Sequence, residues 1–326
     1  MILAGDIGGT KTLLGLYDPG PPLRPVRVES FPSASFPSLE AMIEAFRRDA
    51  PGPIAAAAMG VAGPILGGGA VLPNLAWSVD GARLARLLDV PGVALLNDVE
   101  ASVWALELLG EDGAATLLPG SPAPAGNQAI ISAGTGLGEA DLLRAGARRM
   151  VLPTEAGHAD FAARTELEIE LLRWLRERFG RVCWERVLSG PGLVEVHAFL
   201  AATGRGDEPA WIAAAMRDGD PAAVIASSAL EGTSERCALA LDVFAGAYGA
   251  EAGNLVLRAV ATGGVFLGGG IAPKILPWLR REPFARAFLD KGRLSPLVGA
   301  TPVKVILDER AALLGAARCA AEGPPP

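Results

Sequence analysis

The sequence predicts an α/β protein built from two domains. Its 326 residues exceed what one hydrophobic core usually supports. Short apolar segments alternate with amphipathic ones along the first hundred residues, as in strands layered with helices. A glycine-threonine turn between two apolar segments occurs near the start of each half, at Gly9-Thr10 and Gly134-Thr135. Two related halves would each present such a turn to a shared cleft.

The predicted elements of the first domain follow from apolar spacing and from capping residues. Residues 2–18 predict two strands joined by a glycine turn. A helix is predicted from about Pro37, with Leu39, Met42, Ile43 and Phe46 on one face, and Pro51 ends it. A buried strand is predicted over residues 54–60. Asp80 is predicted to cap a helix through Leu88, before a strand over residues 93–96 and a helix through Leu108.

The second domain is predicted to follow a linker over residues 119–127, which are rich in proline and glycine. A strand over residues 129–132, the turn at Gly134 and a second strand repeat the opening pattern. The rest is mostly helical. A capping box predicts a helix from Thr165 to about Arg178. A strand over residues 263–267, a helix from about Pro273, a last helix over residues 310–321 and a frayed tail complete the prediction.

Composition excludes several classes of protein. The net charge is −7 and the basic residues are scattered, so no nucleic-acid partner is expected. The start resembles no signal peptide, and no apolar run approaches the roughly 18 residues of a membrane span. Three cysteines far apart, Cys183, Cys237 and Cys319, indicate neither a disulfide framework nor a CxxC metal site. We expect a cytoplasmic protein with no membrane partner.

The first glycine turn has the residue types of a phosphate site. Gly8 and Gly9 allow backbone N–H groups to approach an anion, and Thr10 adds a hydroxyl. Asp6 is an acid beside this nest, which magnesium phosphate needs and a plain hairpin does not. For a glycine pair alone, a hairpin turn is the simpler interpretation. The sequence lacks both GxxxxGK[ST] and GxGxxG, so a nucleotide site here must be of another type.

Polar residues that could hold a second substrate follow several apolar segments. Asn97 and Asp98 come at the end of a predicted strand, where a carboxylate can act as a general base. A helix N-cap is an equally good interpretation of this pair. Glu155 and His158 suit vicinal sugar hydroxyls, although a lone histidine is more often structural. With two histidines in the chain, a three-histidine metal site is impossible.

Two further segments have both a functional and a structural interpretation. Glu185 precedes a Ser-Gly-Pro-Gly turn and could bind a ligand or end a helix. Gly268, Gly269 and Gly270 could accommodate adenine or a phosphate at a helix start, or permit a close helix-strand crossing. Asn74 and Trp77 could line a site, but a packed tryptophan is at least as good an explanation.

These motifs, in this order, resemble those of the bacterial glucokinase family, which are ATP-dependent hexose kinases of the actin-like ATPase (hexokinase-type, RNase H-like) fold. The resemblance covers nearly the whole chain. It rests on Asp6-Ile-Gly-Gly-Thr10, Leu96-Asn-Asp98, Ala133-Gly-Thr-Gly-Leu-Gly138, Glu155-Ala-Gly-His158, Glu185-Arg-Val-Leu-Ser-Gly-Pro-Gly192 and the segment 263–273.

The resemblance implies a role for each matched residue. Asp98 would be the catalytic base that takes the proton from the 6-hydroxyl of glucose. Asn97, Glu155, His158 and Glu185 would bind the other sugar hydroxyls. Asp6 would lie near Mg²⁺, through water. The ATP phosphates would contact Gly8, Gly9, Thr10, Gly134 and Thr135, and the adenosine would contact Gly268, Gly269 and Gly270.

The resemblance also implies an architecture and a reaction. The last helix would return to the first domain, giving a small domain of residues 1–108 and 308–326 and a large domain of residues 109–307, with the active site in the cleft. The protein would be a homodimer that makes glucose 6-phosphate and ADP, the entry to glycolysis. Ala156 departs from the family's usual glycine, and the cysteines provide no cysteine-rich zinc motif, so no structural zinc is expected.

Two alternatives remain open at the level of sequence. The enzyme could prefer another hexose or use polyphosphate as donor, which a panel of sugars and donors would separate. The fold could also serve a non-catalytic sugar sensor, although the presence of Asp6 and Asp98 disfavours an inactive kinase. Asp98→Asn should abolish most turnover and leave sugar binding nearly intact if Asp98 is the base.

Overall fold

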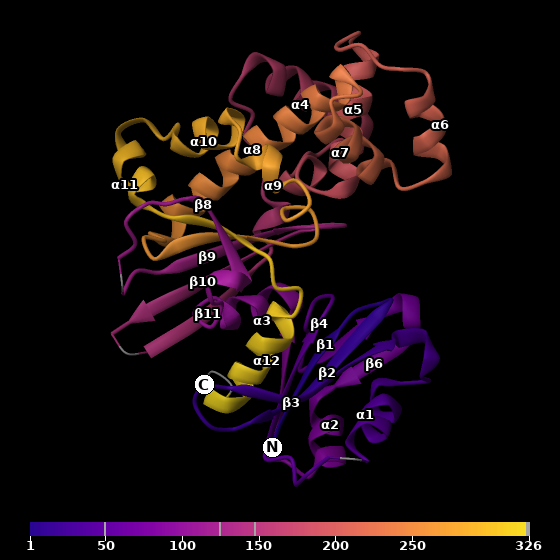
Figure 1. Cartoon of the computed structure of the whole chain (residues 1–326), viewed down its shortest axis with the longest axis vertical. Helices are drawn as coiled ribbons and strands as arrows, with labels where there is room; N and C mark the ends of the chain where they lie inside the picture. Colours follow the sequence, from indigo (N-terminus) through magenta and orange to yellow (C-terminus); the bar gives the residue numbers. More distant parts are fainter. Residues whose placement is uncertain (49, 124, 147, 324–326) are drawn as a thin grey trace. The chain divides into compact units, whose positions relative to one another are not determined.

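The computed structural model describes residues 1–48, 50–123, 125–146 and 148–323, which form two compact units (Figure 1). The first unit comprises Met1–Gly113, Met150–Pro153 and Asp308–Pro326, and the second comprises Ala114–Arg149 and Thr154–Leu307. Pro124 of the predicted linker and residues 324–326 of the predicted tail lie outside the described residues.

A five-stranded sheet organises the first unit, in the order β3-β2-β1-β4-β7. Its strands are β1 (Ile2–Ile7), β2 (Lys11–Asp18), β3 (Arg24–Pro32), β4 (Ala56–Val61) and β7 (Val93–Asn97). β1 pairs antiparallel with β2 and parallel with β4, which in turn pairs parallel with β7. Because β1 and β4 are covered on both faces, they are almost continuously apolar and buried. The carboxyl ends of three parallel strands therefore lie at one edge.

The helices of the first unit are α1 (Leu39–Arg47), α2 (Gly81–Leu88), α3 (Asp98–Ala105) and α12 (Ala311–Glu322), with a small hairpin of β5 (Gly69–Leu72) and β6 (Trp77–Asp80). Ser38 and Asp80 cap α1 and α2, as capping preferences predict for Asp80. Trp77 is buried in the core, so it is a packed tryptophan and not the wall of a ligand site. α12 packs against α3 at Gly315, where a Cβ would lie 1.7 Å from the Ala101 carbonyl oxygen.

A six-stranded sheet organises the second unit, in the order β11-β10-β9-β12-β13-β8. Its strands are β8 (Ala114–Leu118), β9 (Gln128–Ala133), β10 (Leu137–Ala145), β11 (Arg148–Thr154), β12 (Gly264–Gly268) and β13 (Val303–Ile306). β9 pairs antiparallel with β10 and parallel with β12. The second predicted strand-turn-strand is thus confirmed, and its turn lies at the end of β9 beside the end of β12.

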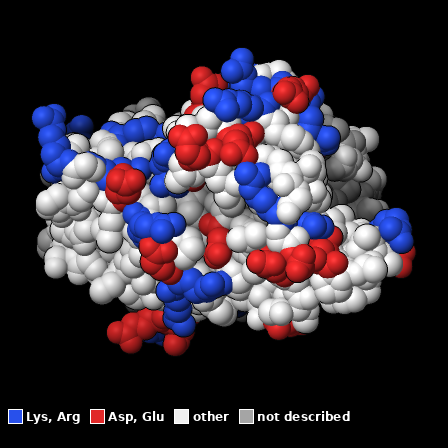
Figure 2. All heavy atoms as spheres, turned by 90° about the horizontal axis from the view of Figure 1, so that it is seen from above, with Lys and Arg blue, Asp and Glu red and all other residues white. Residues whose placement is uncertain are grey.

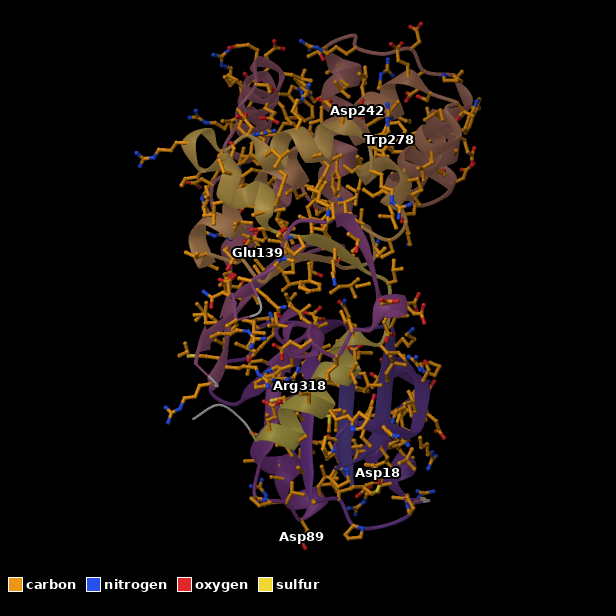
Figure 3. All side chains as sticks on the ribbon, turned by 60° about the vertical axis from the view of Figure 1, so that its left-hand side comes forward. Asp18, Asp89, Glu139, Asp242, Trp278 and Arg318 are labelled. Atoms are coloured by element: carbon orange, nitrogen blue, oxygen red, sulfur yellow. The ribbon has the colours of Figure 1, made fainter. Side chains whose placement is uncertain are left out.

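Helices α4 (Glu166–Phe179), α5 (Gly190–Ala202), α6 (Trp211–Asp218), α7 (Pro221–Glu231), α8 (Glu235–Ala259), α9 (Leu276–Leu279), α10 (Glu282–Leu289) and α11 (Ser295–Ala300) complete the second unit. α8 is the central helix, and α5, α7 and α10 pack against it (Figure 1). It is buried on most of its surface, as expected of a helix in the middle of a unit. The Trp278 indole donates a hydrogen bond to Asp242 of α8 at 2.9 Å (Figure 3).

Two predicted helices differ from the structure. The helix expected from Pro273 begins at Leu276 and has four residues, because Ile271 bonds to the Ala133 carbonyl and holds the preceding segment in turns. The helix predicted through Leu108 ends at Ala105, after which Leu108 and Leu109 close turns on the Ala105 carbonyl. The capping box of Thr165 and Glu168 is present, with α4 ending at Phe179.

Candidate active site

The edge of the first sheet carries Asp6 at the end of β1 and Asp98 directly after the end of β7, with β4 between these two strands. Asp6 is opposite Gly60 of β4, and Gly60 is opposite Leu96 of β7. Asn97 ends β7, and Asp98 begins α3. Ligands of α/β sheets bind beyond such carboxyl ends, so the two carboxylates occupy a typical position for a site.

Asn97 caps α3, so the cap interpretation of this pair is correct for Asn97. Its Oδ1 accepts a hydrogen bond from the Glu100 amide at 2.7 Å, and Glu100 accepts one from the Asn97 amide at 3.3 Å. This capping box occupies only the amide oxygen of Asn97. Asp98 follows the cap, and its Oδ1 accepts a hydrogen bond from the Val99 amide at 3.0 Å. The cap thus fixes the backbone that carries Asp98.

Burial raises the pKa of both acids, and a neighbouring charge raises that of Asp6 further. Burial, followed by the carboxylate of Asp98, raises the pKa of Asp6 to about 6, against a lowering by Lys11. Burial also raises the pKa of Asp98, against hydrogen bonds from the Val99 and Asp98 amides. The raised pKa of Asp98 makes it a stronger base than an exposed aspartate.

Hydrogen bonds from Ser33 stabilise the hairpin between β1 and β2. The Gly8 amide donates to the Lys11 carbonyl at 3.1 Å, and a Cβ on Gly8 would lie 2.7 Å from that oxygen. The Ser33 hydroxyl donates to the Gly8 carbonyl at 2.7 Å and lies 2.9 Å from the Thr12 hydroxyl. Gly9 and Thr10 are exposed, and the Thr10 carbonyl accepts a hydrogen bond from the Ser33 amide at 3.0 Å. The tip of the turn is therefore open to a ligand.

The second glycine-threonine turn joins the antiparallel strands β9 and β10 of the second unit. The Gly134 amide donates to the Gly136 carbonyl at 2.9 Å, and the Gly134 carbonyl accepts from Gly190 at 2.8 Å. Gly190 is the first residue of α5, whose N-cap is Ser189. Thr135 is exposed at the tip. A helix start adjoining the turn adds positive partial charge near it.

The turn after β12 lies against the end of β9. Gly268 is opposite Ser132, and Gly269 has φ of +78°, with its Cβ position 2.2 Å from the Ala133 carbonyl oxygen. Gly269 and Gly270 are exposed, whereas Gly268 is buried. The structure thus brings Gly269 and Gly270 near the Gly134-Thr135 turn. Buried Gly268 is part of the strand and presents little surface to a ligand.

Glu185 joins the polar residues of the second unit. Its Oε2 accepts a hydrogen bond from the Leu137 amide at 3.0 Å, and its Oε1 lies 3.9 Å from His158 Nδ1. The side chain of His158 is 54 % exposed and that of Glu185 is 31 % exposed. Glu155 starts the short 3₁₀ helix Ala156–His158 and is also exposed. Three polar side chains therefore lie near the start of β10.

Gly157 explains why this 3₁₀ helix lies so close to β10. A Cβ on Gly157 would be 2.0 Å from the Leu137 carbonyl oxygen, whereas Ala156 is half-buried and its methyl group is accommodated. The departure at Ala156 therefore disturbs nothing in the structure. The Arg181 guanidinium donates to the His158 carbonyl at 2.7 Å and holds the far end of the 3₁₀ helix.

The structure thus groups the predicted residues within each unit. The first unit brings together Asp6, Gly8, Gly9, Thr10, Asn97 and Asp98, and the second brings together Glu155, His158, Glu185, Gly134, Thr135, Gly269 and Gly270. Sequence reasoning missed Ser33 and Gly157 as supports of these groups. No signal marked Ser33, but the glycine in Glu-Ala-Gly-His could have been questioned as a close backbone approach.

The acids of the first unit have the chemistry of a magnesium site. Mg²⁺ prefers oxygen ligands and keeps several waters. Asp98 places a like charge near Asp6, and Lys11 is the cation that lowers the pKa of Asp6. A divalent cation would therefore stabilise the two carboxylates. The carboxylates of Asp6 and Asp98 are therefore suitable ligands for a hydrated Mg²⁺ ion.

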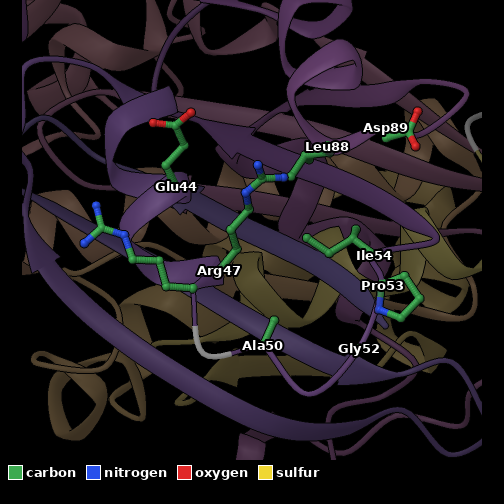
Figure 4. A pocket seen from close by; sticks show the side chains of 9 residues that line it. Glu44, Arg47, Ala50, Gly52, Pro53, Ile54, Leu88 and Asp89 are labelled. Atoms are coloured by element: carbon green, nitrogen blue, oxygen red, sulfur yellow. The ribbon is translucent and has the colours of Figure 1, made fainter.

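Neither the surface charge nor a prominent hollow points to another substrate. Figure 2 shows Lys and Arg side chains interspersed with Asp and Glu on the face in view. A hollow of about 550 Å³ in the first unit is lined by residues that include Glu44, Arg47, Ile54 and Leu88 (Figure 4). None of its described lining residues belongs to the groups above, so we assign it no part in the site. Among the described residues, no helix has both the length and the apolar character of a membrane span.

Comparison with known proteins identifies the family. The sequence model described as Glucokinase matches residues 3–323. The chain is 40 % identical to a glucokinase of Nostoc sp. and 39 % identical to one of Synechocystis sp., in each case over 98 % of this chain and 98–99 % of the relative. A glucokinase structure from an Antarctic psychrotroph is 31 % identical, covers 99 % of both chains and superposes with a TM-score of 0.88. A ROK family glucokinase of Streptomyces griseus, at 22 % identity and a TM-score of 0.63, shares the fold. The chain belongs to the glucokinase family and has its two-domain, actin-like fold.

Proposed function

We propose that this protein transfers the γ-phosphoryl group of ATP to the 6-hydroxyl of glucose, giving glucose 6-phosphate and ADP. The observation that carries the proposal is the place of Asp98, a solvent-accessible carboxylate with raised pKa at the carboxyl edge of a parallel sheet, near Asp6. The full-length match to glucokinases supplies the substrate pair. The two groups of residues would act on one sugar and one nucleotide.

Asp98 is the proposed general base. The carboxylate accepts the proton of the sugar hydroxyl while the hydroxyl oxygen forms its bond to the γ-phosphorus, and the bond from that phosphorus to the ADP oxygen breaks. Phosphoryl transfer passes through a loose transition state, so alignment of these atoms contributes most of the rate. The capping box of Asn97 keeps the backbone of Asp98 fixed during this step.

Asn97 and three residues of the second unit are the proposed sugar ligands. The Asn97 Oδ1 is occupied by the cap, which leaves its amide N–H groups to donate to a hydroxyl. Glu185 Oε2 accepts a hydrogen bond from the Leu137 amide. Its Oε1, which lies beside His158, remains to accept a hydrogen bond from a sugar hydroxyl. Glu155 is exposed at the start of the same 3₁₀ helix.

The glycine turns are the proposed nucleotide ligands. Thr10 and Thr135 would each donate a hydroxyl to the phosphates, and the glycines beside them would donate backbone N–H groups. Gly269 and Gly270 would lie near the adenosine. Asp6 would hold Mg²⁺ through water, and the bound ion would neutralise charge on the phosphates.

A matched pair of aspartates tests the assignment of the base. ADP release from magnesium ATP is measured with glucose, with other hexoses and without sugar, and formation of glucose 6-phosphate is measured with polyphosphate in place of ATP. We expect glucose-dependent release that Asp98→Asn abolishes while glucose binding by calorimetry is retained. Asp89→Asn is the control, because Asp89 is exposed at the end of α2 in a left-handed conformation that asparagine tolerates. Tight glucose binding without any sugar-stimulated release would favour the sensor.

The resemblance further leads us to propose a homodimer located in the cytoplasm. Both follow from the family and not from a contact in the chain. Light scattering of the purified protein, with and without glucose, tests the oligomeric state, and a single monomer mass under both conditions would refute it.

A further inference from the structure

His197, Glu208 and Cys237 converge from three segments of the second unit, away from the residues assigned to sugar and nucleotide. His197 is on α5, Glu208 lies in the segment between α5 and α6, and Cys237 is in the first turn of α8. One ligand atom from each lies within 4.8 Å of the other two. His197 and Cys237 are buried, and the Glu208 side chain is 13 % exposed. We propose that these three side chains form a binding site for Zn²⁺.

The donor atoms are those that zinc selects. An imidazole nitrogen, a carboxylate oxygen and a thiol sulfur are the three ligand types of protein zinc sites, whereas Mg²⁺ and Ca²⁺ prefer oxygen alone. Three protein ligands leave a fourth position for water. Glu208 is the most exposed of the three ligands, so water and the ion would enter from its side.

The distances require one small adjustment. Cys237 Sγ lies 3.9 Å from Glu208 Oε2, close to the roughly 3.6 Å between sulfur and oxygen ligands of a tetrahedral zinc ion. His197 Nε2 and Glu208 Oε2 are 2.5 Å apart and share a hydrogen bond. The ion would replace the shared proton and the Cys237 thiol proton, both of which leave to solvent, and this pair would open to roughly 3.4 Å. Glu208 can move because it lies outside the helices.

Arg236 provides an outer shell for the carboxylate. It donates to Glu208 Oε1 at 2.9 Å, which turns Oε2 toward His197 and Cys237. It also donates to the carbonyl oxygens of Arg205 and Gly206 at 3.1 and 3.0 Å. Ligating carboxylates are commonly held by such hydrogen bonds. The arrangement fastens the chain before Glu208 to the first turn of α8, so a bound ion would join α5 to α8.

The site was not foreseen from sequence, which led us to expect no structural zinc. The three ligands are separated by 11 and 29 residues and form no compact motif. A metal here serves no step of the proposed phosphoryl transfer. The chemistry therefore indicates a stabilising ion, whose binding adds to the folding free energy.

Cobalt reports directly on a thiolate ligand. The full chain, purified without a histidine tag and treated with chelator, is titrated with Co²⁺, and the bound Co²⁺ is then displaced with Zn²⁺. We expect one equivalent of Co²⁺, a near-ultraviolet charge-transfer band from thiolate to cobalt, and a higher melting temperature with Zn²⁺. Cys237→Ser should remove the band and weaken Co²⁺ binding at least tenfold. Cys319→Ser, which removes another buried thiol, should retain the band and the Co²⁺ affinity of the unmodified protein.

Failure of the proposal is visible in the unmodified protein. Absence of the charge-transfer band, or a band that persists in Cys237→Ser, would overturn it. Glu208→Gln is a second variant in case Cys237→Ser does not fold, and unchanged affinity in Glu208→Gln would also refute the site. The charge-transfer band and the melting temperature report metal binding without any turnover. Glucose-dependent ADP release by the metal-treated and the chelated protein is measured in parallel, so failure of the metal site and failure of the proposed kinase activity are distinguished.

Discussion

The carboxylate of Asp98 lies close enough to Asp6 to raise the pKa of Asp6, which burial has already raised, to about 6. The relationship follows from the register, because Asp6, Gly60 and Leu96 are aligned across three parallel strands and Asp98 begins the helix after the third. Two ionised carboxylates at one edge repel each other in the ligand-free protein. Binding of a cation and a phosphate between them would remove this cost.

Asp6→Asn should stabilise the ligand-free protein near neutral pH while it abolishes turnover. The folded pKa of Asp6 lies above its ordinary value of 3.8, so stability is highest with Asp6 neutral and is lost as pH rises from 3.8 through 6. A difference of about two pKa units corresponds to at most about 3 kcal/mol at pH 7. Thermal unfolding of both proteins between pH 4 and pH 8 measures the effect.

Asp18→Asn is the matched control for this prediction. Asp18 ends β2 and is exposed (Figure 3), so its substitution should leave stability nearly unchanged at every pH. The interpretation of Asp6 would be wrong if Asp6→Asn lowered the melting temperature at pH 7. That result would mean that the Asp6 carboxylate is held by attractive contacts that outweigh burial and the charge of Asp98.

Gly157→Ala should weaken glucose binding. Its Cβ would lie 2.0 Å from the Leu137 carbonyl oxygen, so the 3₁₀ helix that carries His158 would have to move away from β10. A shift of about 1 Å in a positioning group can cost a hundredfold in rate. Calorimetry with glucose and steady-state kinetics check the change, and we expect at least a tenfold loss of affinity.

Ala156→Gly tests whether that effect is local. Ala156 is the neighbouring residue of the same 3₁₀ helix, and its methyl group is accommodated in the structure. Its removal should change glucose affinity by less than about threefold, because it relieves no clash and removes no ligand. Equal effects of the two substitutions would mean that backbone freedom, and not the approach to Leu137, determines the sugar site.

Local patterns predicted β1, β2, β4 and β7 of the first unit and β9, β10 and β12 of the second, and they placed Asp6 and Asp98 at strand ends. They predicted none of the other strands, which are β3, β5, β6, β8, β11 and β13. The strand-turn-strand at Gly8 and the helix cap at Asp80 depend on neighbours a few residues away, which a sequence displays. The contact of Glu185 with the Leu137 amide joins residues 48 positions apart, and spacing carries no signal for it. The helix expected from Pro273 failed for a similar reason, since a bond from Ile271 to the distant Ala133 overrides local preference.

The pair Asn97 and Asp98 shows how a local ambiguity is resolved. Both residue types favour an N-cap, and both suit a strand end at a binding site. The structure assigns the cap to the Asn97 side chain and leaves Asp98 one residue further, with raised pKa. The sequence displayed both possibilities, but burial, which determines the pKa, depends on packing that the sequence does not display.

Gly269→Ala should raise the KM for ATP. Gly269 has φ of +78°, which side chains other than glycine rarely adopt, and its Cβ would lie 2.2 Å from the Ala133 carbonyl oxygen. The turn between β12 and the following segment would have to open next to Gly134-Thr135. Gly270→Ala is the control, because a Cβ there meets nothing within 4 Å. If Gly270→Ala raised the KM more than Gly269→Ala, direct contact with the nucleotide would be the stronger effect.

Glu139 of β10 should make the stability of the second unit depend on pH near neutrality (Figure 3). Its side chain is fully buried, and burial, then the like charge of Glu251, raises its pKa to about 7 despite the ion pair with Arg258. Because the ordinary value is 4.5, the protein should lose stability as pH rises from 4.5 through 7. Glu139→Gln should therefore match the unmodified protein at pH 5 and exceed its melting temperature at pH 8.

The control for Glu139 is Glu282→Gln, which removes an exposed glutamate of the same unit and should shift the melting temperature little at either pH. Glu139 Oε1 is buried and has no hydrogen-bond partner among the described residues, so substitution by glutamine removes the charge without breaking a hydrogen bond at this atom. A lower melting temperature of Glu139→Gln at pH 8 would show that attraction to Arg258 exceeds the cost of burial. In that case the ionised glutamate stabilises β10 against α8, and the pH dependence must come from Glu251 or Asp141, whose pKa values burial also raises.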